Sequence, residues 1–135
     1  MPDADRTKAA GPQKKRILLV DDDPDFTSLL KLNLEKTGTY EVQEENRAEE
    51  ALATARAFKP DLVLLDVMMP KLPGGKVVAQ LEADEELKDT PVVFFTAVVP
   101  QETKERKGTI GGRPCIAKPA SPEDVMLSIE KHLRT

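Results

Sequence analysis

The chain is poor in the residues that build disulfides, zinc sites and aromatic stacks. Its 135 residues include one cysteine, one histidine, one tyrosine and no tryptophan. A single cysteine excludes an internal disulfide and argues against a cysteine-ligated zinc site, so a reducing compartment suits the chain. The longest nearly apolar run, residues 92–99, is much shorter than the roughly 20 residues that span a bilayer. The first residues also lack the apolar core of a signal peptide. We therefore expect a cytoplasmic protein without a membrane partner.

Basic residues are in the minority, with 20 lysines and arginines against 24 acidic residues and a net charge of -4. This balance predicts no surface for nucleic acid, so we expect no direct nucleic-acid partner. The contents of hydrophobic residues (39%) and charged residues (33%) are typical of a folded globular domain. We expect residues 1–13, which are polar, to form a flexible tail, and residues 14–135 to form one domain.

Short apolar segments that suit strands alternate with segments of helical spacing. The strands are expected near residues 17–20, 40–43, 62–65, 91–96 and 115–117. Such alternation with short connections predicts an α/β fold, a doubly wound parallel sheet with helices on both faces. The expected arrangement is flavodoxin-like, with five strands in the order 2-1-3-4-5 and five helices. In that order the direction of winding reverses between strands one and three, where ligands bind.

The expected helices differ in how clearly their starts are marked. Pro24 suits a first helical turn, and Ser121 followed by Pro122 gives a capping residue with proline behind it. Asn46 followed by Glu49 resembles a capping box, which predicts a helix that begins there. The segment 99–110 has many charges and hardly an apolar stripe, so it is the weakest candidate for a helix.

Acidic residues follow the two strands that flank the reversal of strand order. Asp66 ends an apolar strand, and Asp21, Asp22 and Asp23 follow another. A capping or turn role is the common structural reason for such a residue. However, a strand buried on both faces has no structural use for a charge at its tip. Since the carboxyl ends of these strands meet at one sheet edge, we expect the carboxylates to converge, with Asp23 serving as a loop or helix-start residue.

Three converging carboxylates repel one another, at roughly 4 kcal/mol per pair for about 4 Å and an effective dielectric of about 20. Either one carboxylate stays protonated or a cation compensates the charge. Oxygen ligands without a nearby histidine favour a hard divalent ion, and few ligands with several waters favour Mg²⁺ over Ca²⁺. A structural Ca²⁺ site is the alternative, but the acidic run lacks the spacing and the terminal glutamate of an EF-hand.

The two remaining strand tips carry Thr96 and Lys118. Individually, a threonine at a strand end and a surface lysine have no special meaning. Around one carboxylate, a metal ion, a lysine cation and a hydroxyl donor form an arrangement suited to phosphoryl transfer.

Taken together, these residues make the chain resemble the receiver (CheY-like) domain of bacterial two-component response regulators, over about residues 14–133. The motifs that carry the resemblance are Ile-Leu-Leu-Val-Asp-Asp-Asp-Pro at 17–24, Leu-Leu-Asp-Val-Met-Met-Pro at 64–70, Gly74, Phe-Phe-Thr-Ala at 94–97 and Lys118-Pro119. The resemblance implies that Asp66 is the phosphoacceptor. It also implies that Asp22 binds Mg²⁺ directly and Asp21 largely through water, with Asp66 and the Met68 carbonyl as further ligands.

The resemblance assigns roles to the other two strand tips as well. Thr96 would hydrogen-bond the phosphoryl group, and Lys118 would bridge Asp66 and later the phosphate, with a cis peptide bond before Pro119. The donor would be a histidine kinase or phosphotransfer protein. The domain would catalyse only its own phosphorylation and dephosphorylation, so it would not be an enzyme in the usual sense. The switch would act on a downstream protein partner, or on a homodimer formed through the face of the fourth helix, fifth strand and fifth helix.

The chain departs from the family three residues before the site lysine, where many receivers carry tyrosine or phenylalanine and this chain has Cys115. Met68 and Val98 lie two residues after Asp66 and Thr96. Their apolar side chains cannot orient an attacking water, which predicts slow hydrolysis of the phosphoryl group.

Three other functions are compatible with parts of the pattern. A receiver fold used as an interaction scaffold without phosphorylation would explain the missing aromatic residue. A phosphatase of the haloacid-dehalogenase type would use Asp21 and Asp23, but it would leave Asp66 without a role. A flavin-binding protein of the same fold would need a phosphate loop where this chain has three acidic residues.

Overall fold

The computed structural model describes residues 14–96, 109–110, 113–118 and 120–133. The predicted tail, residues 1–13, lies outside this part of the chain. Five strands run parallel in the order β2-β1-β3-β4-β6, which is the order predicted from the sequence. They are β1 (Lys15–Val20), β2 (Tyr40–Glu45), β3 (Leu62–Leu65), β4 (Val92–Thr96) and β6 (Arg113–Ala117).

A sixth strand that the sequence did not suggest adds to the edge of this sheet. The two-residue β5 (Thr109–Ile110) pairs antiparallel with β6. It falls at the end of segment 99–110, the weakest candidate for a helix. The rest of this segment, the expected fourth helix, lies outside the described residues.

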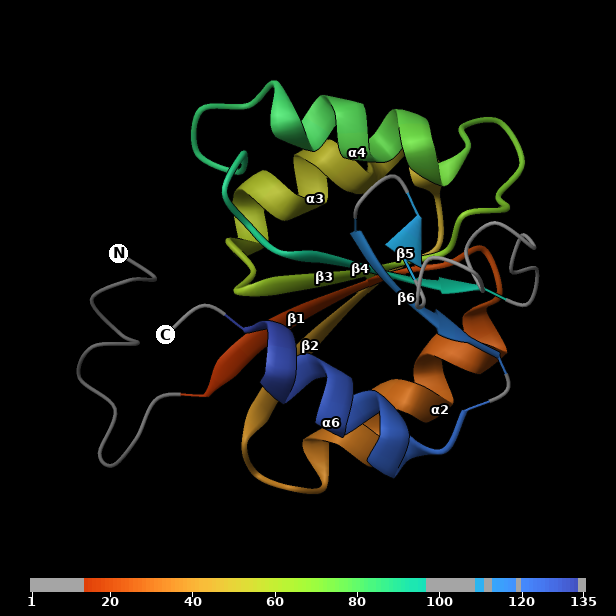
Figure 1. Cartoon of the computed structure of the whole chain (residues 1–135), viewed down its shortest axis with the longest axis vertical. Helices are drawn as coiled ribbons and strands as arrows, with labels where there is room; N and C mark the ends of the chain where they lie inside the picture. The colour runs from red at the N-terminus through yellow and green to blue at the C-terminus, as the bar shows by residue number, and fades with distance from the viewer. Residues whose placement is uncertain (1–13, 97–108, 111–112, 119, 134–135) are drawn as a thin grey trace.

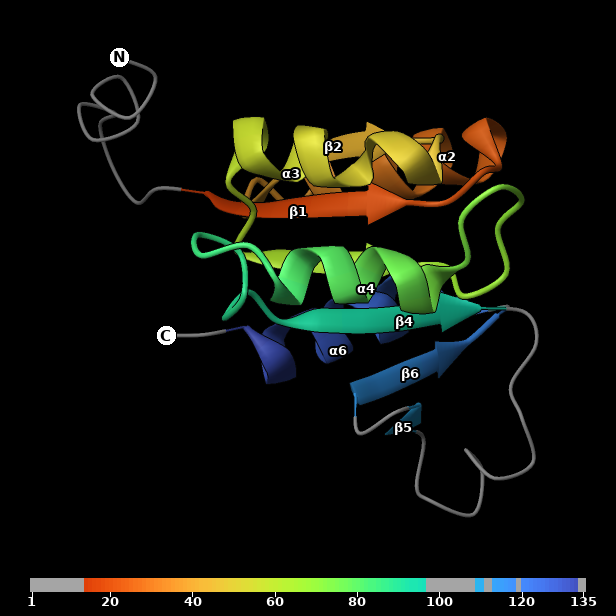
Figure 2. The ribbon, with the colours of Figure 1, turned by 90° about the horizontal axis from the view of Figure 1, so that it is seen from above.

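Helices cover both faces of the sheet (Figure 1). On one face lie α3 (Ala51–Phe58) and α4 (Gly74–Glu82), and on the other lie α2 (Pro24–Glu35) and α6 (Pro122–His132). The short 3-10 helix η1 (Ala48–Glu50) leads into α3. Figure 2 shows the strands side by side between the two helical layers. The predicted α/β architecture is therefore confirmed, with four α-helices in the part of the chain that the structure describes.

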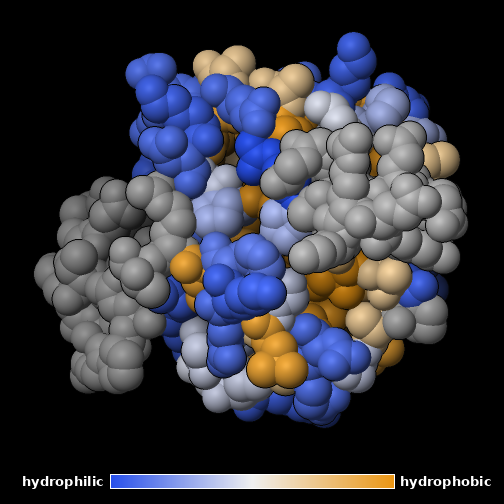
Figure 3. All heavy atoms as spheres, in the orientation of Figure 1, coloured by the Kyte–Doolittle hydropathy of each residue, from blue (hydrophilic) through white to orange (hydrophobic). Residues whose placement is uncertain are grey.

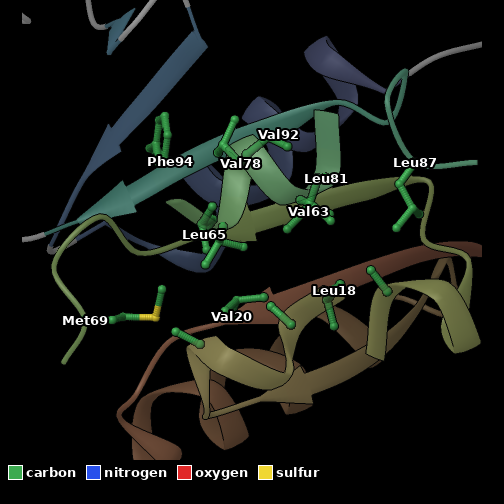
Figure 4. Packing of buried hydrophobic residues seen from close by; sticks show 14 residues of the cluster. Leu18, Val20, Val63, Leu65, Met69, Val78, Leu81, Leu87, Val92 and Phe94 are labelled. Carbon is green, nitrogen blue, oxygen red and sulfur yellow. The ribbon is translucent and has the colours of Figure 1, made fainter. Parts of the chain in front are cut away.

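Two hydrophobic clusters, one on each face, form the core. Successive side chains of a strand point to opposite faces, so β1 and β3 contribute to both clusters. Accordingly, β3 is apolar throughout and β1 is apolar from residue 17 to residue 20. The cluster under α3 and α4 is seen in Figure 4 and includes Leu18, Val20, Val63, Leu65 and Phe94. The cluster under α2 and α6 includes Ile17, Leu19, Leu62, Leu64 and Phe95. A sheet buried on both faces leaves its strand ends as the place for polar chemistry.

Two of the three predicted helix starts are confirmed and one is wrong. Asp23 caps α2 ahead of Pro24, and the Ser121 side chain caps α6. The capping box at Asn46 is not formed, because neither η1 nor α3 has a side-chain hydrogen bond at its N-cap. The Asn46 amide is used elsewhere, at the end of the sheet.

On the face seen in Figure 3, hydrophilic side chains dominate and apolar atoms show only in separate areas. Among the residues that the structure describes, the large apolar side chains that are exposed are Leu29, Leu32, Met68 and Leu127. Within the described ranges, none of the helices combines the length and the apolar character needed to cross a membrane.

Candidate functional site

Three carboxylates meet at the carboxyl end of the sheet. Asp21 directly follows β1 and Asp66 directly follows β3, and these strands are neighbours with Val20 opposite Leu65. The Asp66 N–H donates to the Val20 carbonyl over 2.9 Å, which extends the pairing by one residue. One carboxylate oxygen each from Asp21, Asp22 and Asp66 lies within 4.8 Å of the others. The strand order thus brings together the acids that the sequence singled out.

The three acids differ in their contact with solvent. Asp21 and Asp66 are buried, with 4% and 8% of their surface exposed, whereas Asp22 is exposed. Burial raises the pKa of Asp21 above its ordinary value, although hydrogen bonds from Lys118 and from the Asp23 N–H act in the opposite direction. The cluster therefore concentrates negative charge at this edge of the sheet, with one carboxylate open to water.

Lys118 supplies the cation at this edge, one residue beyond β6. Its ammonium contacts Asp21 Oδ2 directly and lies 4.0 Å from Asp66 Oδ2. The same nitrogen lies 4.1 Å from the centre of the Phe26 ring and 5.5 Å from that of Phe95, which adds cation–π attraction. The lysine therefore reaches both buried acids, but Asp21 holds it more closely than Asp66 does.

Thr96 and Met68 complete the set of predicted site residues. Thr96 ends β4 and pairs in register with Ala117, so its backbone lies at the same edge of the sheet. The Met68 N–H donates to Asp66 Oδ1 over 3.2 Å, and its side chain is 62% exposed. The Met68 carbonyl as a metal ligand stays a prediction. Pro119 and Val98 lie outside the described residues, so the cis bond and the slow hydrolysis stay predictions too.

Asp23 has the loop and helix-start geometry expected of it. Its side chain accepts the N–H groups of Asp25 and Phe26 at the start of α2. Its own N–H donates to Asp21 Oδ1 over 3.0 Å. The carboxylate of Asp23 is thus engaged with the helix, while its backbone supports Asp21.

The start of α4 is packed directly against the backbone that carries Asp66. The Gly74 N–H donates to the Val67 carbonyl over 2.9 Å. A Cβ at position 74 would lie 2.5 Å from the Asp66 carbonyl oxygen and 2.9 Å from Val67 Cα. Only glycine fits so close to another backbone. This contact fixes the loop that carries Asp66 against the start of α4.

Asn46 is the polar residue at this edge that sequence reasoning missed. Its amide donates to the Asp21 carbonyl over 2.8 Å. The signal was available, since Asn46 directly follows β2, the neighbour of β1 in the sheet. Its resemblance to a helix cap concealed it.

Comparison with known proteins agrees with this geometry. Residues 17–130 match the response regulator receiver domain family. RpaA of Synechocystis sp., a DNA-binding dual master transcriptional regulator, is 35% identical over 119 residues, which cover 88% of this chain and 49% of RpaA. The chemotaxis protein CheY4 of Vibrio cholerae has a TM-score of 0.78 at 28% identity and covers 89% of this chain and 99% of its own. The receiver domain of sensor histidine kinase PA1611 from Pseudomonas aeruginosa, solved with a magnesium ion coordinated in its active-site cleft, has a TM-score of 0.75. At 23% identity, over 88% of this chain and 97% of that one, its likeness is one of fold.

One prediction about partners is wrong. The chain spans about half the length of the curated relatives it matches, and RpaA among them binds DNA. The expectation of protein partners without nucleic acid rested on the net charge of -4. That charge describes these residues only and carries no information on the other half of such a regulator. By the residues matched and the fold shared, the chain belongs to the response regulator receiver domain family, the signalling domains of two-component systems.

Proposed function

We propose that Asp66 accepts a phosphoryl group from the phosphohistidine of a histidine kinase or phosphotransfer protein, and that this modification switches an interaction surface. The observation that carries the proposal is the grouping at one edge of the sheet. One carboxylate oxygen from each of Asp21, Asp22 and Asp66 lies within 4.8 Å of the others, and the Lys118 ammonium lies beside them. A cytoplasmic location stays a prediction from the sequence.

The proposed reaction is a transfer between two side chains. An Asp66 carboxylate oxygen attacks phosphorus in line while the bond from phosphorus to the imidazole nitrogen breaks. A P–O bond forms on Asp66, and the imidazole leaves with the bonding electron pair. The Met68 N–H, which donates to Asp66 Oδ1 over 3.2 Å, holds one oxygen of the nucleophile. Later hydrolysis returns the free carboxylate and inorganic phosphate.

The acidic residues suit a bound Mg²⁺ ion by their chemistry and spacing. Three hard oxygen donors share a small volume, and one of them, from Asp22, faces solvent. We propose that Asp21, Asp22, Asp66 and the Met68 carbonyl hold the ion. When bound, Mg²⁺ supplies positive charge that balances the carboxylates and the phosphoryl oxygens.

Lys118 and Thr96 are proposed to recognise the phosphoryl group. Lys118 lies 4.0 Å from Asp66 Oδ2 and is in direct contact with Asp21. New phosphoryl oxygens on Asp66 would add negative charge and acceptors that compete with Asp21 for this ammonium. Thr96, at the end of β4, would donate its hydroxyl to the same oxygens and change the surface beyond that strand.

The proposal is tested by incubating the purified chain with acetyl phosphate and Mg²⁺ and measuring its intact mass. We expect one phosphoryl group per chain, none after chelation of Mg²⁺, and none in Asp66→Asn. Asp124→Asn is the matched control, because Asp124 is an exposed acid in the first turn of α6. It should be modified like the unaltered chain. Equal modification of Asp66→Asn would show that another residue accepts the group.

A receiver fold that works as a scaffold without phosphorylation is the second candidate. Cys115 favours it, since this half-buried residue packs against the core cluster where many receivers place a switching aromatic residue. The same experiment separates the two functions. A folded chain that stays unmodified with acetyl phosphate and Mg²⁺ would support the scaffold and exclude the phosphoacceptor.

A further inference from the structure

Asn46, at the end of β2, is joined by hydrogen bonds to the loop that carries Asp21 and Asp22 and to α2. These hydrogen bonds are not part of the backbone pairing of any helix or of the sheet. The Asn46 amide donates to the Asp21 carbonyl over 2.8 Å and to Thr27 Oγ1 over 2.9 Å. Asn46 follows β2, Asp21 follows β1, and Thr27 belongs to the first turns of α2. One side chain thus connects three elements at the edge of the sheet where the carboxylates meet.

The partner of Asn46 on α2 is itself held firmly. Thr27 has 0% of its surface exposed. Its hydroxyl lies 2.7 Å from Glu44 Oε1, to which it donates, and it accepts from Asn46. Glu44 accepts in addition the Ser28 hydroxyl over 3.0 Å. These hydrogen bonds run in one direction, from Asn46 through Thr27 to Glu44, and leave the Asn46 amide fixed in orientation.

These contacts fix the peptide that joins Asp21 to Asp22. The Asp21 N–H donates to the Glu45 carbonyl over 3.1 Å, and the Asp21 carbonyl accepts from Asn46. A peptide unit is a rigid plane, so the direction of the Asp21 carbonyl determines the direction of the Asp22 N–H and the position of its Cα. Asp22 is the exposed member of the three acids. Its carboxylate is therefore directed by backbone geometry and not by burial.

We propose that Asn46 is a positioning residue for cation binding: by holding the Asp21 carbonyl it orients the Asp21–Asp22 peptide and directs the Asp22 carboxylate toward the other two. The inference rests on the proposed function, in which these carboxylates hold Mg²⁺. It assigns to Asn46 a role that no helix cap provides. The residue acts through the backbone of its neighbours and does not itself touch the ion.

A matched asparagine allows a direct test. Asn33 also donates its amide to a backbone carbonyl, that of Leu29 over 3.1 Å, but within α2. We compare Asn46→Ala with Asn33→Ala by calorimetric titration with Mg²⁺, well below the unfolding temperature of each variant. Loss of a group that orients metal ligands typically weakens binding by ten- to hundredfold, so we expect about tenfold weaker binding in Asn46→Ala. Binding in Asn33→Ala should match that of the unaltered chain.

A measurement without metal tests the orientation itself. The amide ¹H and ¹⁵N chemical shifts of Asp22 should change in metal-free Asn46→Ala and stay in place in Asn33→Ala. Should Asn46→Ala fail to fold, Thr27 gives a second pair of variants. Thr27→Val removes the hydroxyl at nearly equal volume and should weaken Mg²⁺ binding, while Thr27→Ser keeps the hydroxyl and should bind more tightly than Thr27→Val.

The possible outcomes separate this inference from the proposed function. If Asn46→Ala unfolds more easily but binds Mg²⁺ as tightly as the unaltered chain, Asn46 is only a structural residue and the inference is overturned. Equal binding by Thr27→Val and Thr27→Ser would have the same meaning. If the unaltered chain binds no Mg²⁺, the proposed metal site and this inference fail together.

Discussion

At the amino end of the parallel sheet charged groups are matched one to one, whereas at the carboxyl end three carboxylates share one ammonium. Arg16 Nε lies 3.5 Å from Glu41 Oε1, and Arg56 Nε lies 2.5 Å from Asp84 Oδ2. The first pair joins β1 to β2, and the second joins α3 to the segment after α4. At the other end, Lys118 is in contact with Asp21 and 4.0 Å from Asp66.

The pKa shifts of two aspartates express the same contrast. The hydrogen bond from Arg56 holds the pKa of Asp84 below its ordinary value. Burial raises the pKa of Asp21 above its ordinary value, even though Lys118 acts to lower that pKa. Both residues are buried: Asp84 has 9% of its surface exposed and Asp21 has 4%. Charge at the amino end is thus stabilised by its partners, whereas charge at the carboxyl end is retained against a cost, as is typical of functional sites.

Backbone contacts hold the carboxyl end together where its side chains repel one another. The tightest is the approach of Gly74 to the backbone of Asp66 and Val67. Gly74→Ala should therefore destabilise the fold more than removal of either Lys118 or Arg56. A Cβ placed 2.5 Å from a main-chain oxygen must displace α4 or the loop, which should lower the free energy of unfolding by about 3 kcal/mol, measured by urea denaturation.

The next residue provides the control for this change. Nothing lies within 4 Å of a Cβ added at Gly75. Alanine favours the helix over glycine, so Gly75→Ala should leave stability unchanged or raise it by up to about 1 kcal/mol. Equal losses in Gly74→Ala and Gly75→Ala would mean that the close packing beneath Asp66 does not exist in solution.

Removal of the single cation tests the contrast between the two ends directly. Lys118→Met leaves a buried acid without its counter-charge and should lower the free energy of unfolding by about 2 kcal/mol without Mg²⁺. Added Mg²⁺ should narrow this difference, because a divalent ion would compensate the same carboxylates. The measurement is urea denaturation of the variant and the unaltered chain, with and without the ion.

The matched change at the amino end is Arg56→Met. The Arg56 side chain is 56% exposed, so its ion pair is partly screened by water and should contribute less. The decrease in the free energy of unfolding of Arg56→Met should also be independent of Mg²⁺. If Mg²⁺ reduced the loss of stability equally in Lys118→Met and Arg56→Met, the ion would be stabilising the whole chain and not the acidic edge of the sheet.

The sequence was sufficient for those parts of the site that follow from topology. Asp21 and Asp66 could be placed together because each ends an apolar strand and the two strands are neighbours at the reversal of strand order. Their burial follows as well, since helices cover both faces. This reasoning needs only the alternation of apolar segments, which is the strongest pattern in the chain.

The remainder depends on side-chain packing and short-range geometry that leave no periodic signal. A two-residue strand such as β5 is too short to show alternation. Lys118 contacts Asp21 more closely than Asp66, and its ammonium lies 4.1 Å from the centre of the Phe26 ring, a contact between distant parts of the chain. Asn46 matched a local capping motif, yet its amide binds a carbonyl 25 positions away in the sequence.

The smallest expected effect is a pH dependence that arises from Asp84 at the amino end. Because the pKa of Asp84 is lowered in the folded chain, its ionised form stabilises the fold above the pKa of the unfolded chain. This contribution is lost as pH falls through the folded-state pKa. Asp84→Asn should therefore be less stable than the unaltered chain at pH 7, with a thermal midpoint a few degrees lower. The difference should shrink steadily below about pH 4.

The neighbouring acid serves as the control for this titration. Glu85 forms a 3.4 Å ion pair with Lys88, but its side chain is 89% exposed. Water screens such a pair, so Glu85→Gln should follow the unaltered chain at every pH. Parallel curves for Asp84→Asn and the unaltered chain down to about pH 2 would show that Arg56 does not stabilise the ionised acid. In that case the amino end would hold its charges no better than the carboxyl end does, and the contrast between the two would rest on Lys118 alone.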